Sequence, residues 1–314
     1  MNIQQLEYIL AVDNFRHFAK AAEACNVTQP TLSMMIQKLE EELDVKIFDR
    51  TKHPIEPTLV GQKIIGQARV VLKHFGQIKE VVANEQNVAH GTFKMGIIPT
   101  VASYLVPVML EKQQHTYSEI ELLLKETTTG NLIKEILNGS LDGGILAGPL
   151  HHPELTEYPV YYEKFYAYVS PLNDLLYREK AIDLNQIDIN DVWLLENEHC
   201  LRGQIERLCR LKKRIPAENA AIKYESGSIE TLIHVVDYNP GITIIPEMHA
   251  MGLSEDKQEN LRPFKNTTAV REVSLVVSND YVRKTLLNRI LEIIRESVPK
   301  SMQNPDLKAF VVDL

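Results

Sequence analysis

The chain has 314 residues, of which 44% are hydrophobic and 24% are charged, as is typical of a soluble protein with roughly two or three domains. No stretch approaches the roughly 18 to 20 apolar residues of a membrane-spanning helix, and the first residues lack the basic start and apolar run of a signal peptide, so we expect a cytoplasmic protein. The net charge of −8 disfavours proteins that coat nucleic acid nonspecifically, because those usually carry a basic surplus.

Residues 1–65 contain seven Lys or Arg and nine Asp or Glu, so a DNA-binding role for them must rest on the arrangement of side chains. Apolar residues recur at helical spacing on both sides of the polar break at Asp13-Asn14, which predicts two short helices. Cys25, at the end of the second, is interpreted as a packing residue. A third helix is predicted to start after Thr28, whose hydroxyl can cap it, with Pro30 tolerated in its first turn.

The third helix is predicted to bury one apolar stripe and to expose small polar side chains. The stripe consists of Leu32, Ile36, Leu39 and Leu43. Hydroxyl and amide side chains near the start of a helix can reach base edges in the major groove. We therefore expect DNA contacts from Thr28, Gln29, Pro30, Thr31, Ser33, Met34, Gln37 and Lys38.

A turn at residues 52–54 follows this helix and indicates a wing that carries Arg50 and Lys52 towards DNA phosphates. The acidic run at residues 40–42 would lie away from the groove if the start of the helix is inserted. Periodicity alone also allows a plain three-helix bundle with a solvated polar face, and that alternative stays open.

A long helix is predicted to begin after Thr58, which can cap it. Its apolar residues recur in alternating steps of four and three, the spacing of a coiled-coil seam. The seam consists of Ile64, Ala68, Val71, Phe75, Ile78 and Val82. A seam of this length on one helix favours a contact between two subunits over a core stripe, so we predict dimerisation. Residues 84–91 are interpreted as a linker.

Beyond Gly91, short apolar segments alternate with helical patterns, which predicts an α/β fold. The expected strands are 93–98, 119–124, 143–146, 165–169 and 242–245. Ligand sites in open α/β sheets lie at the carboxyl ends of strands, so Thr100 after the first strand and residues 127–129 after the second are candidates for a cleft. Three threonines in a turn are also common as capping residues, and that alternative stays open. Residues 301–314 show no readable pattern.

Residues 199–202, with Cys209 nearby, place one thiol beside two side chains that can be cationic. A thiol reacts as its thiolate, which a neighbouring cation stabilises, so His199 and Arg202 are candidates for activating Cys200. A fast reaction with peroxide also needs donors aimed at the departing hydroxide, for which Thr100 is a candidate.

The segment between the two thiols has helical spacing. Nine helical steps of about 1.5 Å separate Cys200 from Cys209 by roughly 13 Å. A disulfide requires Cα atoms less than about 7 Å apart. A bond between these cysteines would therefore require the helix to unwind, which is what a redox switch needs.

The same cysteines can also be inert, as most intracellular thiols are. A zinc site is disfavoured because one histidine and two cysteines with this gap lack the paired spacing of structural zinc ligands. We predict no metal and no other cofactor. In a reducing cytoplasm a permanent disulfide is not expected, so a Cys200–Cys209 bond would be transient and sensory.

The run from Phe18 to Arg50 resembles the winged helix-turn-helix of LysR-type transcriptional regulators, and the resemblance extends over essentially the whole chain. It implies an N-terminal all-α winged helix-turn-helix, a long linker helix, and a two-subdomain α/β regulatory region like that of periplasmic binding proteins. The implied bounds are 1–58 for the DNA-binding domain, 59–90 for the linker or dimerisation helix and hinge, 91–300 for the redox-sensing regulatory domain, and 301–314 for a C-terminal tail. The family usually assembles as tetramers.

Within that family, residues 96–100, 126–129, 195–202 and 241–246 look like those of hydrogen-peroxide-sensing members. The resemblance implies that Cys200 is the peroxidatic cysteine and Cys209 the resolving one in a reversible disulfide. It also implies a peroxide pocket formed by Thr100, Thr129, His199, Arg202 and Arg271. Met34 departs from the arginine or small residue of many relatives, which leaves the operator sequence open.

We therefore expect a transcription regulator without enzymatic activity that binds double-stranded promoter DNA and reacts with hydrogen peroxide. A thiol reductant of the glutaredoxin or thioredoxin type would reset it, and it would be a homodimer or homotetramer. One alternative is a LysR-type regulator that binds a small metabolite in its cleft, with passive cysteines. The other is a thiol peroxidase whose N-terminal helices only dimerise.

Overall fold

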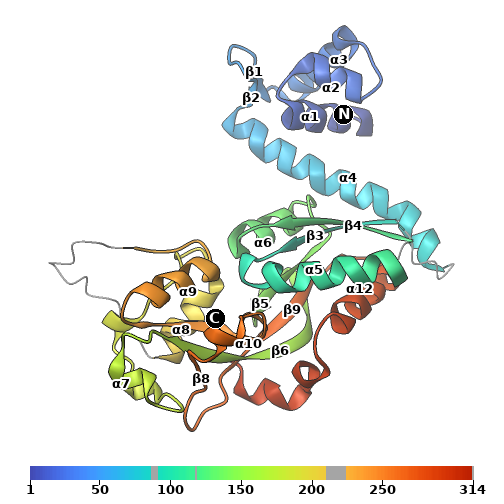
Figure 1. Cartoon of the computed structure of the whole chain (residues 1–314). Coiled ribbons are helices and arrows are strands. Elements are labelled where there is room, and N and C mark those ends of the chain that lie inside the picture. Colours follow the sequence, from blue (N-terminus) through green and yellow to red (C-terminus); the bar gives the residue numbers. More distant parts are fainter. Residues whose placement is uncertain (86–90, 117–118, 210–223, 313–314) are drawn as a thin grey trace. The chain divides into compact units, whose positions relative to one another are not determined.

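The computed structural model describes residues 1–85, 91–116, 119–209 and 224–312. The chain divides into two compact units, Met1–Val88 with Leu137–Ser140, and Ala89–Ile136 with Leu141–Leu314. The elements of the first unit are α1 (Ile3–Phe15), α2 (Phe18–Ala24), α3 (Gln29–Leu43), β1 (Phe48–Asp49), β2 (Glu56–Pro57) and α4 (Leu59–Glu85) (Figure 1). One apolar core joins α1, α2, α3 and the start of α4, with Ile9, Leu32 and Ile65 among its buried members.

The helices of the first unit begin where capping side chains satisfy free backbone N–H groups. At α3, the Thr28 hydroxyl accepts a hydrogen bond from the Thr31 N–H at 3.4 Å. At α4, the Thr58 hydroxyl accepts from the Gly61 N–H at 2.9 Å and donates to the Lys46 carbonyl at 2.6 Å. Both predicted N-caps are confirmed.

The predicted wing is a two-stranded antiparallel hairpin of β1 and β2. Its base is held by Glu40 of α3, whose side chain is fully buried. The Glu40 carboxylate accepts hydrogen bonds from the N–H groups of Ile47 at 2.8 Å and Phe48 at 3.3 Å. Glu40 is therefore a structural residue of the wing. The apolar stripe of α3 ends earlier than predicted, because Leu43 in its last turn is 37% exposed.

The second unit contains a sheet whose strands come from distant parts of the chain. Its elements are β3 (Gly91–Ile97), α5 (Pro99–Thr116), β4 (Ile120–Glu126), α6 (Thr129–Leu137), β5 (Gly143–Gly148), β6 (Leu155–Val169), α7 (Asp174–Tyr177), η1 (Leu184–Gln186), η2 (Ile189–Asp191), α8 (Cys200–Leu208), α9 (Ile229–Tyr238), β7 (Ile242–Pro246), α10 (Glu247–Met251), α11 (Glu255–Gln258), β8 (Leu261–Arg262), β9 (Val270–Ser278), α12 (Lys284–Glu296), η3 (Lys300–Gln303) and η4 (Pro305–Phe310).

The strands follow the order β4-β3-β5-β9-β6-β7, with β8 pairing β6. The β3–β4 and β3–β5 pairs are parallel, and the pairs of β9 with β5 and of β6 with β9, β7 and β8 are antiparallel. The long strand β6 pairs with β9 along residues 155–164 and with β7 along residues 165–169. It therefore runs through two lobes, one with α5, α6 and α12 and the other with α8, α9 and α10 (Figure 1).

The five predicted strands are present, as β3, β4, β5, the end of β6, and β7. Strand β9 and the first part of β6 were not predicted from the sequence. Charged residues interrupt the apolar pattern in both, with Arg271 and Glu272 in β9 and Glu163 in β6, yet these three side chains are buried. The C-terminal segment, also without a prediction, includes a parallel bridge between Val270 and Val311.

Candidate functional site

Helix α8 has the two predicted switch cysteines at its two ends. Cys200 is its first residue, and Cys209 is its C-cap, with its N–H donating to the Ile205 carbonyl at 3.0 Å. Both thiols are free. Because the helix rises about 1.5 Å per residue, its two ends are roughly 13 Å apart, well beyond the roughly 7 Å limit for a disulfide. The helical spacing predicted for this segment is confirmed, and a Cys200–Cys209 bond requires α8 to unwind.

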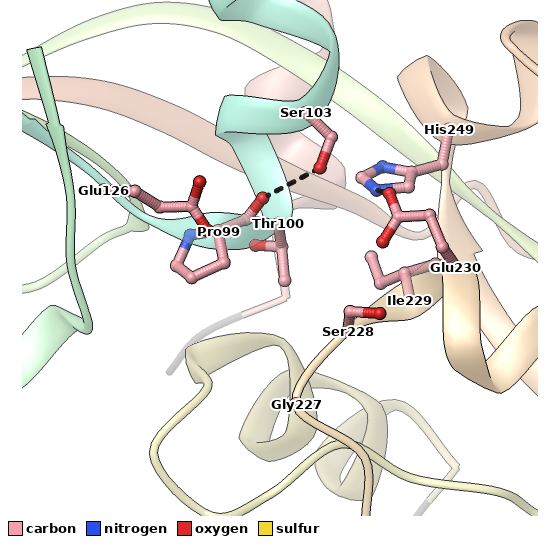
Figure 2. A pocket seen from close by; sticks show the side chains of 9 residues that line it. All are labelled: Pro99, Thr100, Ser103, Glu126, Gly227, Ser228, Ile229, Glu230 and His249. Carbon is pink, nitrogen blue, oxygen red and sulfur yellow. Dashed lines mark hydrogen bonds and ion pairs between the residues drawn. The ribbon is translucent and has the colours of Figure 1, made fainter.

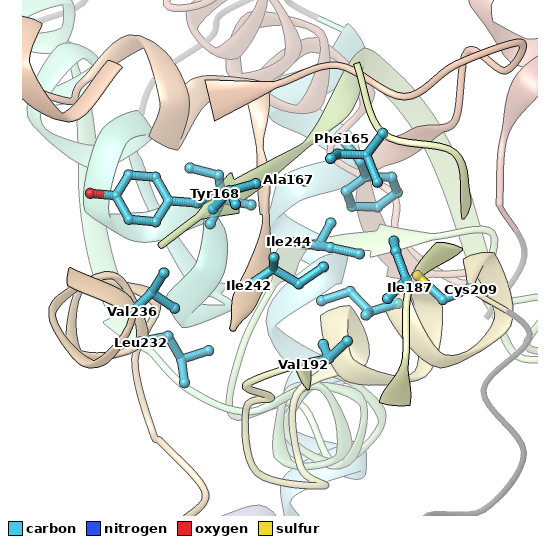
Figure 3. Close-up of a cluster of buried hydrophobic side chains, with 14 of the residues drawn as sticks. Phe165, Ala167, Tyr168, Ile187, Val192, Cys209, Leu232, Val236, Ile242 and Ile244 are labelled. Atoms are coloured by element: carbon cyan, nitrogen blue, oxygen red, sulfur yellow. The ribbon is translucent and has the colours of Figure 1, made fainter. Parts of the chain in front are cut away.

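The two cysteines lie in different surroundings. Cys200 is half-buried at the start of α8, where free backbone N–H groups and the helix macrodipole stabilise negative charge. Cys209 is buried in the apolar core of the α8 lobe, where Figure 3 shows it beside Ile187. This burial raises the pKa of the Cys209 thiol to about 12. At neutral pH Cys209 is therefore protonated while α8 is intact.

The raised pKa of Cys209 predicts a stability difference at alkaline pH. The contribution of the buried thiol is complete below the unfolded pKa of about 8.5 and is lost as the pH rises towards the folded pKa of about 12. Between about pH 9 and pH 11, we expect the free energy of unfolding of the reduced protein to fall faster than that of Cys209→Ala, by about 1 kcal/mol per pH unit. Urea unfolding of both proteins at matched pH measures this slope, and equal slopes would contradict it.

The two residues predicted to activate Cys200 lie close to it in the chain but differ in their contacts. His199 is 9% exposed and occupies the N-cap position of α8 without a side-chain capping bond. The Arg202 guanidinium donates to the carboxylates of Glu206 at 2.9 Å and Glu225 at 2.7 Å, and to the Leu195 carbonyl at 2.9 Å. Two carboxylates therefore compensate the charge of Arg202, and its donors stabilise the start of α8.

Thr100 and Arg271 are brought together, as the predicted pocket requires. Arg271 of β9 is fully buried, and its guanidinium donates to the Thr100 hydroxyl at 3.1 Å and the Thr100 carbonyl at 2.8 Å. Its Nε donates to Glu163 of β6 at 2.7 Å, and the other oxygen of Glu163 accepts from the Met248 N–H at 3.1 Å. This ion pair therefore connects α5, β6, β9 and α10.

Next to Thr100 lies a cavity of about 80 Å³, shown in Figure 2. Its walls come from the starts of α5 and α9, from the end of β4, and from α10. The lining residues are Pro99, Thr100, Ser103, Glu126, Gly227, Ser228, Ile229, Glu230 and His249. Of the residues predicted for the peroxide pocket, only Thr100 lines this cavity. Thr129, at the start of α6, is half-buried and lies outside the lining, as do His199, Cys200 and Arg202.

Glu230 and His249 are polar residues of this cavity that were not predicted from the sequence. The His249 Nε2 lies 3.5 Å from a Glu230 carboxylate oxygen. This contact lowers the pKa of Glu230 to about 2, whereas burial lowers the pKa of His249. At neutral pH the pair is therefore a carboxylate beside a neutral imidazole. His249 follows the carboxyl end of β7. Ligand sites lie at the carboxyl ends of strands in α/β sheets, so the reasoning that selected Thr100 would also have selected His249.

The residues predicted to contact DNA belong to the first unit, and most lie on the surface of α3. Gln29, Pro30, Thr31, Gln37 and Lys38 are exposed, Met34 is 50% exposed, and Ser33 is half-buried. In the wing, Lys52 pairs with Glu56.

Arg50 has several contacts inside the first unit. Its guanidinium donates to the Ser33 hydroxyl at 3.1 Å, lies 3.5 Å from the Glu40 carboxylate, and stacks over the Phe18 ring at 5.0 Å. Arg50 therefore holds the wing against α3.

The predicted coiled-coil seam on α4 has two parts. Ala68 is buried in the core of the first unit, and Ile64 packs against that core. Farther along, Val71 is 44% exposed, Phe75 50% and Ile78 64%. The second part of the seam is an apolar surface row that the first unit's own core does not cover.

No described helix is long and apolar enough to cross a membrane. The described residues also include no group of three or more His, Cys, Asp or Glu side chains arranged to hold a metal ion.

Two domains of one protein family match the chain. Residues 3–62 match the bacterial regulatory helix-turn-helix proteins of the lysR family, and residues 86–299 match the LysR substrate binding domain. Among curated proteins, the chain is 31% identical over 298 residues to a hydrogen peroxide-inducible genes activator of Haemophilus influenzae, covering 95% of this chain and 97% of the relative. It is 32% identical to the DNA-binding transcriptional dual regulator OxyR of Escherichia coli, covering 79% and 80%.

Solved structures show the same similarity. A full-length OxyR variant from Pseudomonas aeruginosa is 29% identical, with a TM-score of 0.77, and the alignment covers 94% of this chain and 98% of that one. A hydrogen-peroxide-bound OxyR variant from Corynebacterium glutamicum is 25% identical, with a TM-score of 0.61 and coverage of 94% and 92%. The predicted fold class, a winged helix-turn-helix followed by a two-lobed α/β region, is confirmed.

Proposed function

Because the chain belongs to the LysR family of bacterial regulators and is similar to its hydrogen peroxide-inducible genes activators, we propose that it is a transcriptional activator that senses hydrogen peroxide in oxidative stress. A reversible Cys200–Cys209 disulfide is its switch. The observation that carries this proposal is the helix α8, with a half-buried thiol at its start and a buried thiol at its end.

The proposed reaction has two steps. The Cys200 thiolate attacks one oxygen of hydrogen peroxide, the O–O bond breaks, and the departing hydroxide takes a proton and leaves as water. The sulfenic acid formed at Cys200 is then attacked by the Cys209 sulfur, so that the S–S bond forms while the sulfenic OH leaves with the thiol proton as a second water. Peroxide is reduced by two electrons and the two thiols are oxidised by two. A dithiol reductant of the glutaredoxin or thioredoxin type returns those electrons through a mixed disulfide.

The pocket in which peroxide binds is part of the proposal. Thr100, Thr129, His199, Arg202 and Arg271 are proposed to supply it, and the contact of Arg271 with Thr100 supports the pairing of these two. The Thr100 hydroxyl accepts from Arg271, so its own proton is available for a peroxide oxygen. Arg202 would serve by holding the start of α8, since its Nε and Nη1 already donate to three acceptors.

Formation of the disulfide is proposed to change the contacts of the protein with double-stranded promoter DNA. The exposed side chains of α3 support insertion of its start into the major groove, with Lys38 and Lys52 near phosphates. The exposed row of Val71, Phe75 and Ile78 supports dimerisation through α4, since water-exposed apolar seams are stabilised by a second helix. Homodimers are proposed to pair into homotetramers in the cytoplasm.

The functional division of the chain is proposed to follow the predicted bounds. Residues 1–58 would bind DNA, 59–90 would form the linker or dimerisation helix and hinge, 91–300 would sense peroxide, and 301–314 would be a C-terminal tail. The two family matches, at 3–62 and 86–299, support the first and third of these segments.

The switch predicts a disulfide that depends on peroxide. After treatment of the reduced protein with one equivalent of hydrogen peroxide, we expect peptide mass spectrometry to find Cys200 linked to Cys209, and a thiol reductant to remove the link. Cys25 should stay reduced and alkylatable after unfolding, because burial raises its pKa and so disfavours the thiolate that reacts with peroxide. The proposal would be contradicted if Cys200 and Cys209 both remain free thiols after the peroxide treatment, or if Cys200 forms a disulfide with Cys25.

A second candidate function is a LysR-type regulator that binds a small metabolite, with passive cysteines. The cavity beside Thr100 favours it, because hydroxyl groups, a carboxylate and an imidazole converge there. An enzymatic role as a thiol peroxidase would instead require sustained turnover of peroxide with a reductant and no salt-dependent binding to promoter DNA.

A further inference from the structure

Gln204, in the middle of α8, forms hydrogen bonds with two parts of the second unit that are distant from α8 in the sequence. Its side chain is fully buried. The amide nitrogen donates to the Gly148 carbonyl at 3.4 Å and to the Val312 carbonyl at 3.4 Å. Gly148 is the last residue of β5, and Val312 lies in the C-terminal segment. One side chain therefore connects the redox helix, a strand of the other lobe and the end of the chain.

The two halves of the Gln204 side-chain amide differ in their contacts. Its carbonyl oxygen is buried and has no hydrogen-bond partner among the described residues. The contribution of this side chain to the reduced fold therefore comes from the two backbone carbonyls that its amide nitrogen satisfies, and a side chain without these donors would leave both carbonyls short of a hydrogen bond.

The C-terminal segment, residues 305–312, packs through η4 against β6 and β9, and its Val312 packs against the apolar core of the α8 lobe. The Val312 N–H donates to the Val270 carbonyl of β9 at 2.9 Å, and the Val312 carbonyl accepts from Gln204. A cavity of about 360 Å³ lies between this segment and the connection that follows β5, lined by Pro149, His151, Glu157, Glu272, Lys308 and Val311. The segment is therefore not closely packed over this connection, and the bond to Gln204 is one of the contacts that hold it.

We propose that Gln204 is a positioning residue that latches the C-terminal segment to the reduced form of α8, so that this segment sets how readily the Cys200–Cys209 disulfide forms. The inference rests on the proposed redox function. Unwinding of α8 on oxidation moves Gln204 away from Gly148 and Val312, and releases residues 305–312. Because coupling is reciprocal, the bond that holds the segment to α8 also opposes oxidation.

The first test measures the dithiol–disulfide equilibrium of full-length protein in glutathione buffers, by mass spectrometry of alkylated thiols. Gln204→Met keeps the length of the side chain and removes both donors. We expect it to favour the disulfide by about tenfold, which for a two-electron couple is a midpoint about 30 mV more negative. A chain ending at Asn304 should shift in the same direction. Adding Gln204→Met to that shortened chain should have a smaller effect than in the full chain, because the bond to Val312 is already lost and only the bond to Gly148 remains to be broken.

Gln303→Met is the matched control. The Gln303 side-chain amide also donates to two backbone carbonyls, those of Arg295 at 2.7 Å and Val298 at 3.2 Å, but these are not on α8. It should leave the redox equilibrium within about twofold of the wild type. A shift as large as that of Gln204→Met would mean that any loosening near the C-terminus favours oxidation, and would overturn the latch.

The second test is hydrogen exchange of the amides in residues 305–312. In reduced protein, we expect Gln204→Met to raise the exchange rate about tenfold and Gln303→Met to leave that of Val312 unchanged. Oxidised wild type should exchange like reduced Gln204→Met. Equal protection in reduced wild type and Gln204→Met would overturn the inference. If wild type forms no disulfide with peroxide, the proposed function fails, while the comparison of the reduced proteins still decides whether Gln204 holds the segment.

Discussion

Replacing Cys200 by serine is expected to abolish the response to peroxide while leaving DNA binding intact. Cys200→Ser keeps the size and position of the side chain at the start of α8 but has no sulfur to oxidise. The promoter footprint of the variant should be the same before and after hydrogen peroxide, and no link to Cys209 should form. Wild type should show a changed footprint within minutes, since each molecule needs only one reaction with peroxide.

The matched control is Cys25→Ser. Cys25 is also a free thiol, at the C-cap of α2, and burial raises its pKa. It should preserve the peroxide-dependent footprint. If instead Cys200→Ser still changes its footprint under peroxide, the thiol mechanism is wrong and the cavity beside Thr100 becomes the site to examine, as for a regulator that binds a metabolite. Salt must be held constant, because phosphate contacts make affinity strongly dependent on it.

Replacing Arg271 is expected to have the largest effect on stability. Arg271→Met removes the guanidinium of a fully buried ion pair and leaves the Glu163 carboxylate in the interior with its Met248 contact. Loss of one partner of a buried pair costs about 3 to 5 kcal/mol, because the remaining charge is uncompensated. For a domain of this size the midpoint of thermal unfolding should fall by about 10 °C. Calorimetry of the reduced protein measures it.

Two further variants distinguish a lost ion pair from a general packing defect. Arg289→Met breaks an ion pair with Glu292 in which both side chains are about half exposed, and it should cost less than about 1 kcal/mol. The double variant Arg271→Met/Glu163→Met removes both buried charges and should recover much of the lost stability, because paired apolar replacements avoid the desolvation cost. A double variant less stable than Arg271→Met would contradict this explanation.

The helices and most of the strands could be predicted because their signals are local. Thr28 and Thr58 cap the helices that follow them, since a cap acts on an N–H group three residues away. The same holds for α8, whose helical spacing between Cys200 and Cys209 was visible in the sequence. That spacing was enough to show that the two thiols cannot pair without a rearrangement.

The candidate site could be predicted only in part. Thr100 and Arg271 were selected separately, and their contact joins residues far apart in the chain. His249, Glu230 and Gln204 were missed, because their importance depends on what surrounds them after folding. Strand β9 was missed for a related reason, since Arg271 and Glu272 interrupt its apolar pattern.

The sequence by itself determined the local elements, the spacing of the thiols and the resemblance to a regulator family. Only the tertiary structure decided which charged and polar groups are buried and what each one contacts. The physical reason is that a buried charge is tolerated only beside a partner, and the partner of Arg271 is Glu163, more than one hundred residues earlier in the chain. Periodicity describes one segment at a time and carries no information about such distant partners.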